Sequence, residues 1–209
     1  MKKAARLLSI LGILLAASCI NDNDSAVNNS GKIKIIGTGD IVSKEVTVDA
    51  FNSIQNVGVT NIYYTKGNTR KVVLKAQQNI LDVMKYSVTN NELVLSTDDN
   101  VSISTSKEIS AEITNPDLTS INIVGTGNID LTGSGQSNLI IVATGTGNIN
   151  AYDFPVDTCS ISMTGTGWCK VNVNKLLHVT LTGIGSVYYK GHPEIHSSIT
   201  GLGSIVDKN

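Results

Sequence analysis

The sequence predicts an all-β protein, built as a right-handed parallel β-helix-like solenoid that follows an irregular N-terminal β region. Three observations support this prediction. A Gly-x-Gly phrase recurs five times in the second half of the chain, and apolar residues alternate with polar ones around the copies. The 209 residues include 19 glycines and only 3 prolines, a composition that favours strands and turns over helices.

The glycine phrase returns at a nearly constant interval, with first glycines separated by 20, 20, 18 and 18 residues. A period of this size is typical of stacked repeats. The glycines of the five copies are Gly125 and Gly127, Gly145 and Gly147, Gly165 and Gly167, Gly183 and Gly185, and Gly201 and Gly203. We assign them a structural role: they share the parity of the inward-facing positions, and we expect them to face inward where the chain bends and a Cβ would collide.

The residues around each phrase fall into columns with a period of two. The column four residues before the first glycine reads Ile121, Ile141, Ile161, Val179 and Ser197, and the positions one residue away are mostly polar. This alternation predicts short strands with one buried face, stacked by parallel pairing between successive repeats. The alternative is an antiparallel meander or β-prism with hairpins of the same period. It suits the turn at residues 133–135, but later repeats lack that signal.

The preceding region, residues 32–116, has strand and turn patterns without a regular period. We expect strands at Lys32–Ile36, Ile41–Val48, Ser53–Tyr64, Lys71–Ala76, Met84–Val88, Glu92–Ser96 and Ser110–Thr114. Gln77–Val83 is the one plausible helical turn, and Asn90-Asn91 predicts a hairpin because asparagine tolerates positive φ. The repeats then occupy residues 117–209, and we expect them to continue the preceding region as one domain.

The N-terminus predicts export. Residues 1–18 resemble a signal peptide, with an early positive charge and an apolar stretch too short to span a bilayer. The small residues before Cys19 resemble a bacterial lipobox, which implies lipidation at Cys19; the alternative is ordinary cleavage after Ser18. Residues 19–31 read as a flexible tether. Residue 20 is Ile and not Asp, so the lipobox resemblance implies sorting to the outer membrane of a Gram-negative cell. We expect an outer-membrane lipoprotein, periplasmic or surface-facing, that contacts the membrane through its N-terminal lipid.

The residue inventory argues against several kinds of chemistry. The 16 basic and 17 acidic residues give no basic field that would suggest nucleic acid. The glycine phrases lack the third glycine of a dinucleotide-binding loop. Only five carboxylates follow Leu118, and no two of them share an outward column. We expect a non-enzymatic protein with no cofactor.

Candidate binding residues lie at outward positions of the repeats. Tyr152, Trp168 and Tyr188 are outward aromatic residues that suit a glycan or protein ligand. His178 and His196 are 18 residues apart and should stack on adjacent turns, which makes them weak metal candidates; a simple surface pair is the preferred interpretation, so no metal is predicted.

Two cysteines fall in inward columns of the repeats. Cys159 and Cys169 are expected to behave as small buried apolar residues, although export to an oxidising compartment also allows a disulfide between them.

Several ordered motifs resemble a known family. They are residues 50–54 (Ala-Phe-Asn-Ser-Ile), the segments Asn79-Ile80-Leu81 and Asn91-Glu92-Leu93, Asn115–Leu118, and the repeats, of which Gly145–Asn150 is the nearest match. Together they resemble the head GIN domain family of putative auto-transporter adhesins, over nearly all of the mature chain. The resemblance implies a β-helix-like fold and a role in adhesion.

The combined expectation is a cell-envelope adhesin or ligand-binding module that presents a rigid β surface. The first alternative is a structural envelope protein that self-associates through an open C-terminal turn, because the last repeat has no evident cap. A polysaccharide-active enzyme is the second.

Overall fold

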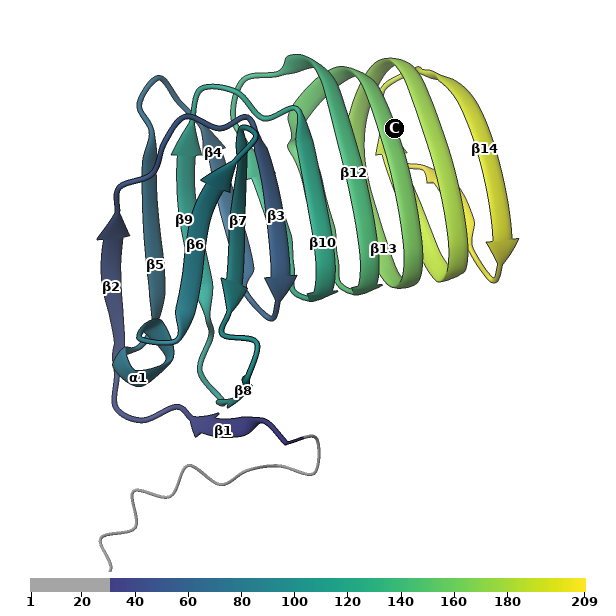
Figure 1. The fold of residues 1–209 in the computed structure, drawn as a ribbon. Helices are drawn as coiled ribbons and strands as arrows, with labels where there is room; N and C mark the ends of the chain where they lie inside the picture. The colour runs from purple at the N-terminus through teal and green to yellow at the C-terminus, as the bar shows by residue number, and fades with distance from the viewer. Residues whose placement is uncertain (1–30) are drawn as a thin grey trace, which may run out of the picture.

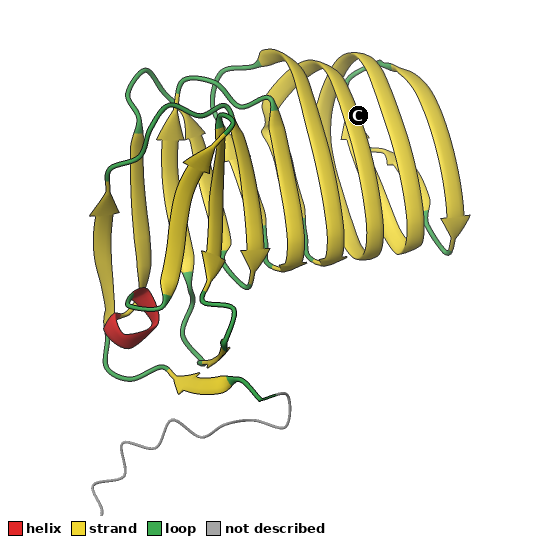
Figure 2. Cartoon of the chain, viewed as in Figure 1, coloured by secondary structure: helices red, strands yellow, loops and turns green. Residues whose placement is uncertain are grey.

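The computed structural model describes residues 31–209 (Figure 1). The predicted signal peptide, the predicted lipidation site Cys19 and nearly all of the predicted tether lie outside the described residues. Within residues 31–209 the only helix is α1 (Gln78–Leu81), inside the helical turn that the sequence predicts (Figure 2). All other elements are strands, so the all-β prediction is confirmed. No helix of this part of the chain is both long and apolar enough to cross a bilayer.

The glycine repeats stack as successive turns of a curled sheet. β10 (Ser120–Thr126), β12 (Gln136–Thr146), β13 (Ile149–Lys190) and β14 (Glu194–Gly201) pair in parallel. The glycines lie opposite one another, with Gly125 paired to Gly145 and Gly145 to Gly165. The parallel pairing predicted from the repeats is therefore confirmed, and the antiparallel alternative is wrong for this region.

Each turn supplies one strand before its Gly-x-Gly bend and one after it. After the bends, β11 (Ile129–Thr132) pairs in parallel with the start of β13, and β15 (Ser204–Asp207) pairs in parallel with its end. β13 is assigned as one long strand because the chain remains paired through its successive bends (Figure 1). The two strands of each turn bring inward-facing apolar side chains toward a shared core.

The N-terminal region contributes turns to the same stack. β3 (Ser53–Gly58) pairs in parallel with β10, which places Gly58 opposite Gly125, and β4 (Asn61–Lys66) pairs in parallel with β11. On their other side, β3 and β4 pair with β7 (Glu92–Thr97) and β9 (Ser110–Asn115). The stacking order therefore differs from the chain order: the turn at residues 53–66 lies between residues 92–115 and residues 120–132.

Antiparallel strands cover the N-terminal end of the stack. β2 (Ile41–Val46) and β5 (Lys71–Gln77) extend the side that contains β9, and β6 (Met84–Thr89) extends the side that contains β7. The β6–β7 hairpin turns at Asn90 and Asn91, both with positive φ, as predicted. β1 (Ile33–Ile36) pairs with β8 (Val101–Ser104), a strand that the sequence did not predict.

The C-terminal end of the stack is open. Among the described strands, β14 and β15 pair only with β13, so each has one edge without a partner strand in residues 31–209. Ile195 and Ile199 continue inward columns but are 38% and 41% exposed, whereas their counterparts one turn earlier, Leu177 and Leu181, are buried. The apolar core thus reaches solvent at the last turn.

The inward columns form one continuous core. Ile121, Ile141, Ile161 and Val179 are all buried, which confirms the period-two prediction for this column. Tyr64 and Phe154 are not part of any predicted column, yet they fill the core with an edge-on ring contact whose centroids are 5.9 Å apart.

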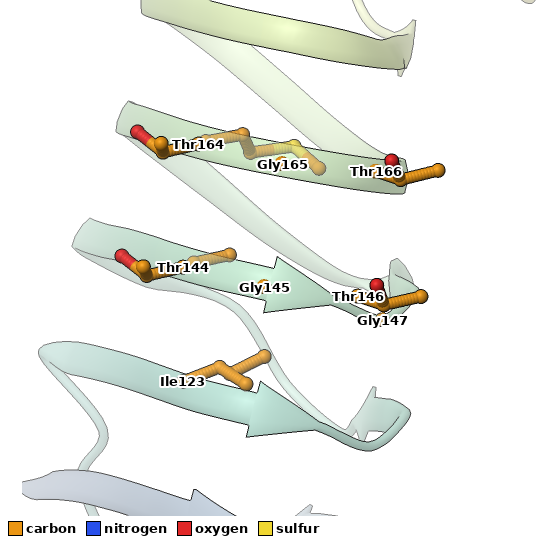
Figure 3. A pocket seen from close by; sticks show the side chains of 10 residues that line it. Ile123, Thr144, Gly145, Thr146, Gly147, Thr164, Gly165 and Thr166 are labelled. Carbon is orange, nitrogen blue, oxygen red and sulfur yellow. The ribbon is translucent and has the colours of Figure 1, made fainter.

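The repeat glycines lie against the backbone of the preceding turn. A Cβ at Gly145 would lie 2.2 Å from the carbonyl oxygen of Gly125, and a Cβ at Gly147 would lie 2.2 Å from that of Gly127. Gly145 also has a φ of +123°, which side chains rarely allow. A side chain at these positions would therefore collide with the backbone of the preceding turn. The residue parity had suggested a collision with the side chains of the core instead. Figure 3 shows Thr146 and Thr166 projecting from adjacent turns beside these glycines.

Replacing Gly147 with valine should destabilise the fold much more than replacing Thr146 with valine. The first change forces backbone atoms of two turns apart, at a cost of about 1–3 kcal/mol or more. The second changes an exposed strand residue and should alter the free energy of unfolding by less than about 0.5 kcal/mol. Urea unfolding measures both, and similar midpoints for the two variants would contradict the stacking described.

Cys159 and Cys169 are free and buried in the core. Burial raises the pKa of the Cys159 thiol to about 12, and burial with the neighbouring Cys159 raises the pKa of Cys169 well above its usual value. Both side chains are therefore neutral at ordinary pH and shielded from solvent.

Iodoacetamide at about pH 8 should leave Cys159 and Cys169 unmodified in the folded protein, because the thiolate is the reactive form. The same reagent should alkylate both after denaturation without reductant. Mass spectrometry of the two peptides measures each site separately. Labelling of the folded protein, or a linked Cys159–Cys169 peptide, would be inconsistent with two buried free thiols.

Candidate functional site

The outward side chains of the strands after the bends form a continuous surface along the stack. Asp130 lies beside Tyr63 on one turn and beside Asn150 on the next, and Tyr188 lies beside Val206 further along. Neighbouring strands in a sheet are about 4.8 Å apart, so side chains from residues distant in sequence become close neighbours. We call this surface the ladder face.

A ladder of asparagines holds the bends at one margin of this face. The Asn61 Oδ1 accepts a hydrogen bond of 2.9 Å from the Asn128 backbone N–H. Asn128 Oδ1 accepts one of 3.2 Å from the Asn148 N–H, and Asn148 Oδ1 accepts one of 3.2 Å from the Trp168 N–H. Each amide oxygen thus satisfies a backbone donor of the next turn. The repeated asparagine is structural, and Trp168 ends the series.

Replacing Asn148 with alanine should lower the free energy of unfolding by about 1–2 kcal/mol, because the Trp168 N–H loses its acceptor. Asn148→Asp keeps an oxygen at this position and serves as the matched control, with a smaller expected loss. Chemical denaturation of both variants is the measurement. An alanine variant as stable as the parent protein would show that the ladder does not support the bends.

The structure brings the three predicted aromatic residues together. Tyr152, Trp168 and Tyr188 line one hollow on the ladder face with Lys170 and Lys208, and its volume is about 440 Å³. The rings are half-buried, so each exposes part of its surface while the strand below fixes its position. We call this site the aromatic–lysine hollow.

Lysine ammonium groups lie against every ring of the hollow. Lys170 Nζ is 4.3 Å from the centroid of the Trp168 ring system and 5.8 Å from that of Tyr152. Lys190 Nζ is 4.7 Å from the Tyr152 centroid, and Lys208 Nζ is 5.5 Å from the Tyr188 centroid. These distances fit cation–π contacts, which contribute about 0.5–1 kcal/mol each at exposed sites.

The lysines of this hollow were missed by the sequence analysis, although a signal was available. Lys170, Lys190 and Lys208 share the outward parity of the aromatic residues. None of the three belongs to an ion pair within residues 31–209, whereas Lys175 at the margin of the stack pairs with Asp157 at 2.8 Å. The hollow therefore carries positive charge that no described carboxylate neutralises.

A second, smaller hollow adjoins the first and has a different polarity. Its volume is about 240 Å³, and its lining includes Tyr63, Asp130, Asn150 and again Trp168. The Tyr63 hydroxyl donates a 2.6 Å hydrogen bond to Glu108. This bond, together with burial and the nearby negative charge, raises the pKa of Tyr63 to about 12, and the same bond lowers the pKa of Glu108. The ladder face thus changes from acidic and amide groups toward lysines along the stack.

The glycine repeats do not form a ligand pocket. The cavity beside Gly145, Gly147 and Gly165 has a volume of about 10 Å³ (Figure 3). That space is about the size that one water molecule requires. The glycines therefore serve the stacking of the turns.

The two candidate histidines lie elsewhere, on the strands before the bends. His178 and His196 stand opposite each other in the β13–β14 register, with ring centroids 5.1 Å apart. The His196 Nε2 lies 2.8 Å from Glu194 Oε1. Within residues 31–209, no group of three or more His, Cys, Asp or Glu side chains is arranged to hold a metal ion.

Comparison with known proteins identifies relatives of this chain. Residues 50–141 and 123–193 match the family described as "Putative auto-transporter adhesin, head GIN domain". A solved structure of a putative adhesin from Bacteroides fragilis NCTC 9343 is 23% identical and has a TM-score of 0.60, covering 83% of this chain and 100% of its own. This likeness concerns the fold.

Two other solved structures are more distant. A putative lipid binding protein from Parabacteroides distasonis ATCC 8503 is 16% identical, with a TM-score of 0.49, and covers 84% of this chain and 100% of its own. A putative adhesin from Parabacteroides merdae ATCC 43184 is 14% identical, with a TM-score of 0.43, and covers 84% of this chain and 99% of its own. A search of the curated proteins gave no match.

Proposed function

Since the chain belongs to the putative auto-transporter adhesin, head GIN domain family, we propose that it is a ligand-binding module that acts through its aromatic–lysine hollow. One observation carries this proposal. Three aromatic side chains from separate turns converge on a single hollow of about 440 Å³, on strands held in register by backbone pairing. A fixed surface of this kind suits recognition, because its side chains lose little freedom on binding.

The distribution of carboxylates supports a non-catalytic role. Asp130 accepts a hydrogen bond from Asn150, Asp157 pairs with Lys175, and Glu194 contacts His196. These acids lie on different turns and are already engaged with other partners. Hydrolysis of a glycosidic bond needs two carboxyl groups that face the same bond.

The location and the detailed architecture form part of the same proposal. We place the protein outside the cytoplasm, anchored through a lipid on Cys19 after removal of residues 1–18, on the basis of the N-terminal sequence. The successive turns are proposed to wind as a right-handed parallel β-helix. The parallel pairing of the repeats supports this arrangement, since parallel crossover connections are almost always right-handed.

A second candidate function is self-association of a structural envelope protein. The exposed Ile195 and Ile199 at the open end favour it, because two such ends could cover each other. Light scattering over a range of protein concentrations tests for self-association. A protein that stays monomeric at every concentration would exclude the self-associating envelope function.

The binding function predicts that Trp168→Ala lowers affinity for a ligand identified on glycan and matrix-protein arrays by about tenfold or more, as expected when a central aromatic contact is lost. Tyr86→Ala is the matched control: Tyr86 is exposed on β6 and also has a lysine, Lys44, over its ring at 5.8 Å. The control should bind like the parent protein. Absence of any ligand on the arrays, or equal binding by the two variants, would contradict the proposal.

A further inference from the structure

We propose that the aromatic–lysine hollow recognises an anionic polysaccharide, a polymer whose sugar rings carry carboxylate or sulfate groups. This inference rests on the proposed ligand-binding function and specifies its ligand class. It depends on three features of the described residues: the positive charge of the hollow, the position of the lysines over the rings, and the length of the ladder face.

The hollow concentrates positive charge without a matching negative charge. Lys170, Lys190 and Lys208 come from three different turns and converge on the same group of rings. No carboxylate is among the described residues that line this hollow, and Asp130, which lines the adjoining hollow, accepts a 3.0 Å hydrogen bond from Asn150. An anionic ligand would therefore meet cations in the larger hollow, while remaining clear of acidic side chains there.

The contact between lysines and rings favours charged sugars over neutral ones. A sugar that stacks on the face of Trp168 beside Lys170 displaces the Lys170 ammonium, which lies 4.3 Å from the ring centroid. A neutral sugar offers the displaced ammonium only hydroxyl and ether oxygens, which are weaker partners for a cation than an anionic group. A sugar with an anionic substituent can place its C–H face on the ring and its charge beside the lysine, so both groups keep a favourable contact.

The dimensions of the ladder face favour a polymer. The two hollows share Trp168 and together extend from Tyr63 to Lys208. This distance covers five strand separations, or about 24 Å. In the smaller hollow, the side-chain amides of Asn128, Asn148 and Asn150 are hydrogen-bonded within the stack, and each has further donor or acceptor capacity suited to sugar hydroxyls, because an amide carries two N–H donors and two oxygen lone pairs. One end of the face thus suits hydroxyl groups and the other suits anionic substituents.

The experiment compares ligands that differ only in charge. Calorimetric titration of the protein with polygalacturonate and with its methyl ester tests carboxylates, and titration with dextran sulfate and with dextran tests sulfates. We expect at least one charged polymer to bind about tenfold or more tightly than its neutral counterpart. This preference should shrink as the salt concentration rises to about 0.5 M, because salt screens exposed charges.

Charge-matched variants test whether the hollow causes this preference. Lys208→Gln and Lys170→Gln should each reduce affinity for the charged polymer several-fold, and each should lower the urea midpoint only slightly, as expected when exposed cation–π contacts are lost. Lys44→Gln removes the same charge from the Lys44–Tyr86 pair on another surface, and it should bind like the parent protein. Equal losses for Lys208→Gln and Lys44→Gln would overturn the inference.

Other outcomes separate this inference from the proposed function. The protein could bind charged and neutral polymers equally and lose both on Trp168→Ala. That result would overturn the anionic ligand class and leave the ligand-binding function intact. Failure to bind any of the four polymers would also overturn the ligand class. Binding to phosphatidylglycerol vesicles with none to the polymers would assign the hollow to a membrane surface instead. The proposed function is overturned separately, by the absence of any ligand on the arrays or by equal binding of the Trp168→Ala and Tyr86→Ala variants.

Discussion

The close, in-register stacking of backbone at the Gly-x-Gly bends is the constraint on which the rest of the structure depends. A Cβ at Gly145 or Gly147 would lie 2.2 Å from a carbonyl oxygen of the preceding turn. Glycine at these positions lets adjacent bends approach closely enough for the strands on either side to pair in parallel. The register of every inward and outward column follows from that approach, because a slip of one residue would exchange the two faces.

The same register places outward side chains of successive turns side by side on one surface. Each outward residue lies beside the equivalent residue of the next turn. Where one turn has Asn148 the next has Trp168, and where an earlier turn has Asp130 a later one has Lys170, so the side chain changes while the backbone position is kept. The asparagine ladder secures the bends up to Trp168. Beyond that point the column continues with Ser186 and Ser204, whose hydroxyls lie 3.0 Å apart. The aromatic and cationic residues of the hollow lie around Trp168 and in the neighbouring outward columns. Scaffold and candidate site are thus successive parts of one face.

Much of the repeat architecture could be predicted from the sequence, because both the glycine period and the apolar alternation depend on local residue type. The stacking of residues 53–66 between later segments could not: Gly58 is followed by Val59 and Thr60, so this turn lacks the second glycine of the phrase. The outward aromatic residues were predicted as candidates. The lysines over their rings depend on side-chain conformations across turns, and a linear pattern of outward positions does not contain that information.

Residues far apart in the sequence form one binding surface because the turns stack in register. Hydrogen–deuterium exchange of the protein with and without polygalacturonate measures this directly. We expect increased protection in separate peptides that contain Tyr152, Trp168, Tyr188 and Lys208, with little change at Tyr86. Protection confined to one continuous segment, or to β14 at the open end, would contradict it.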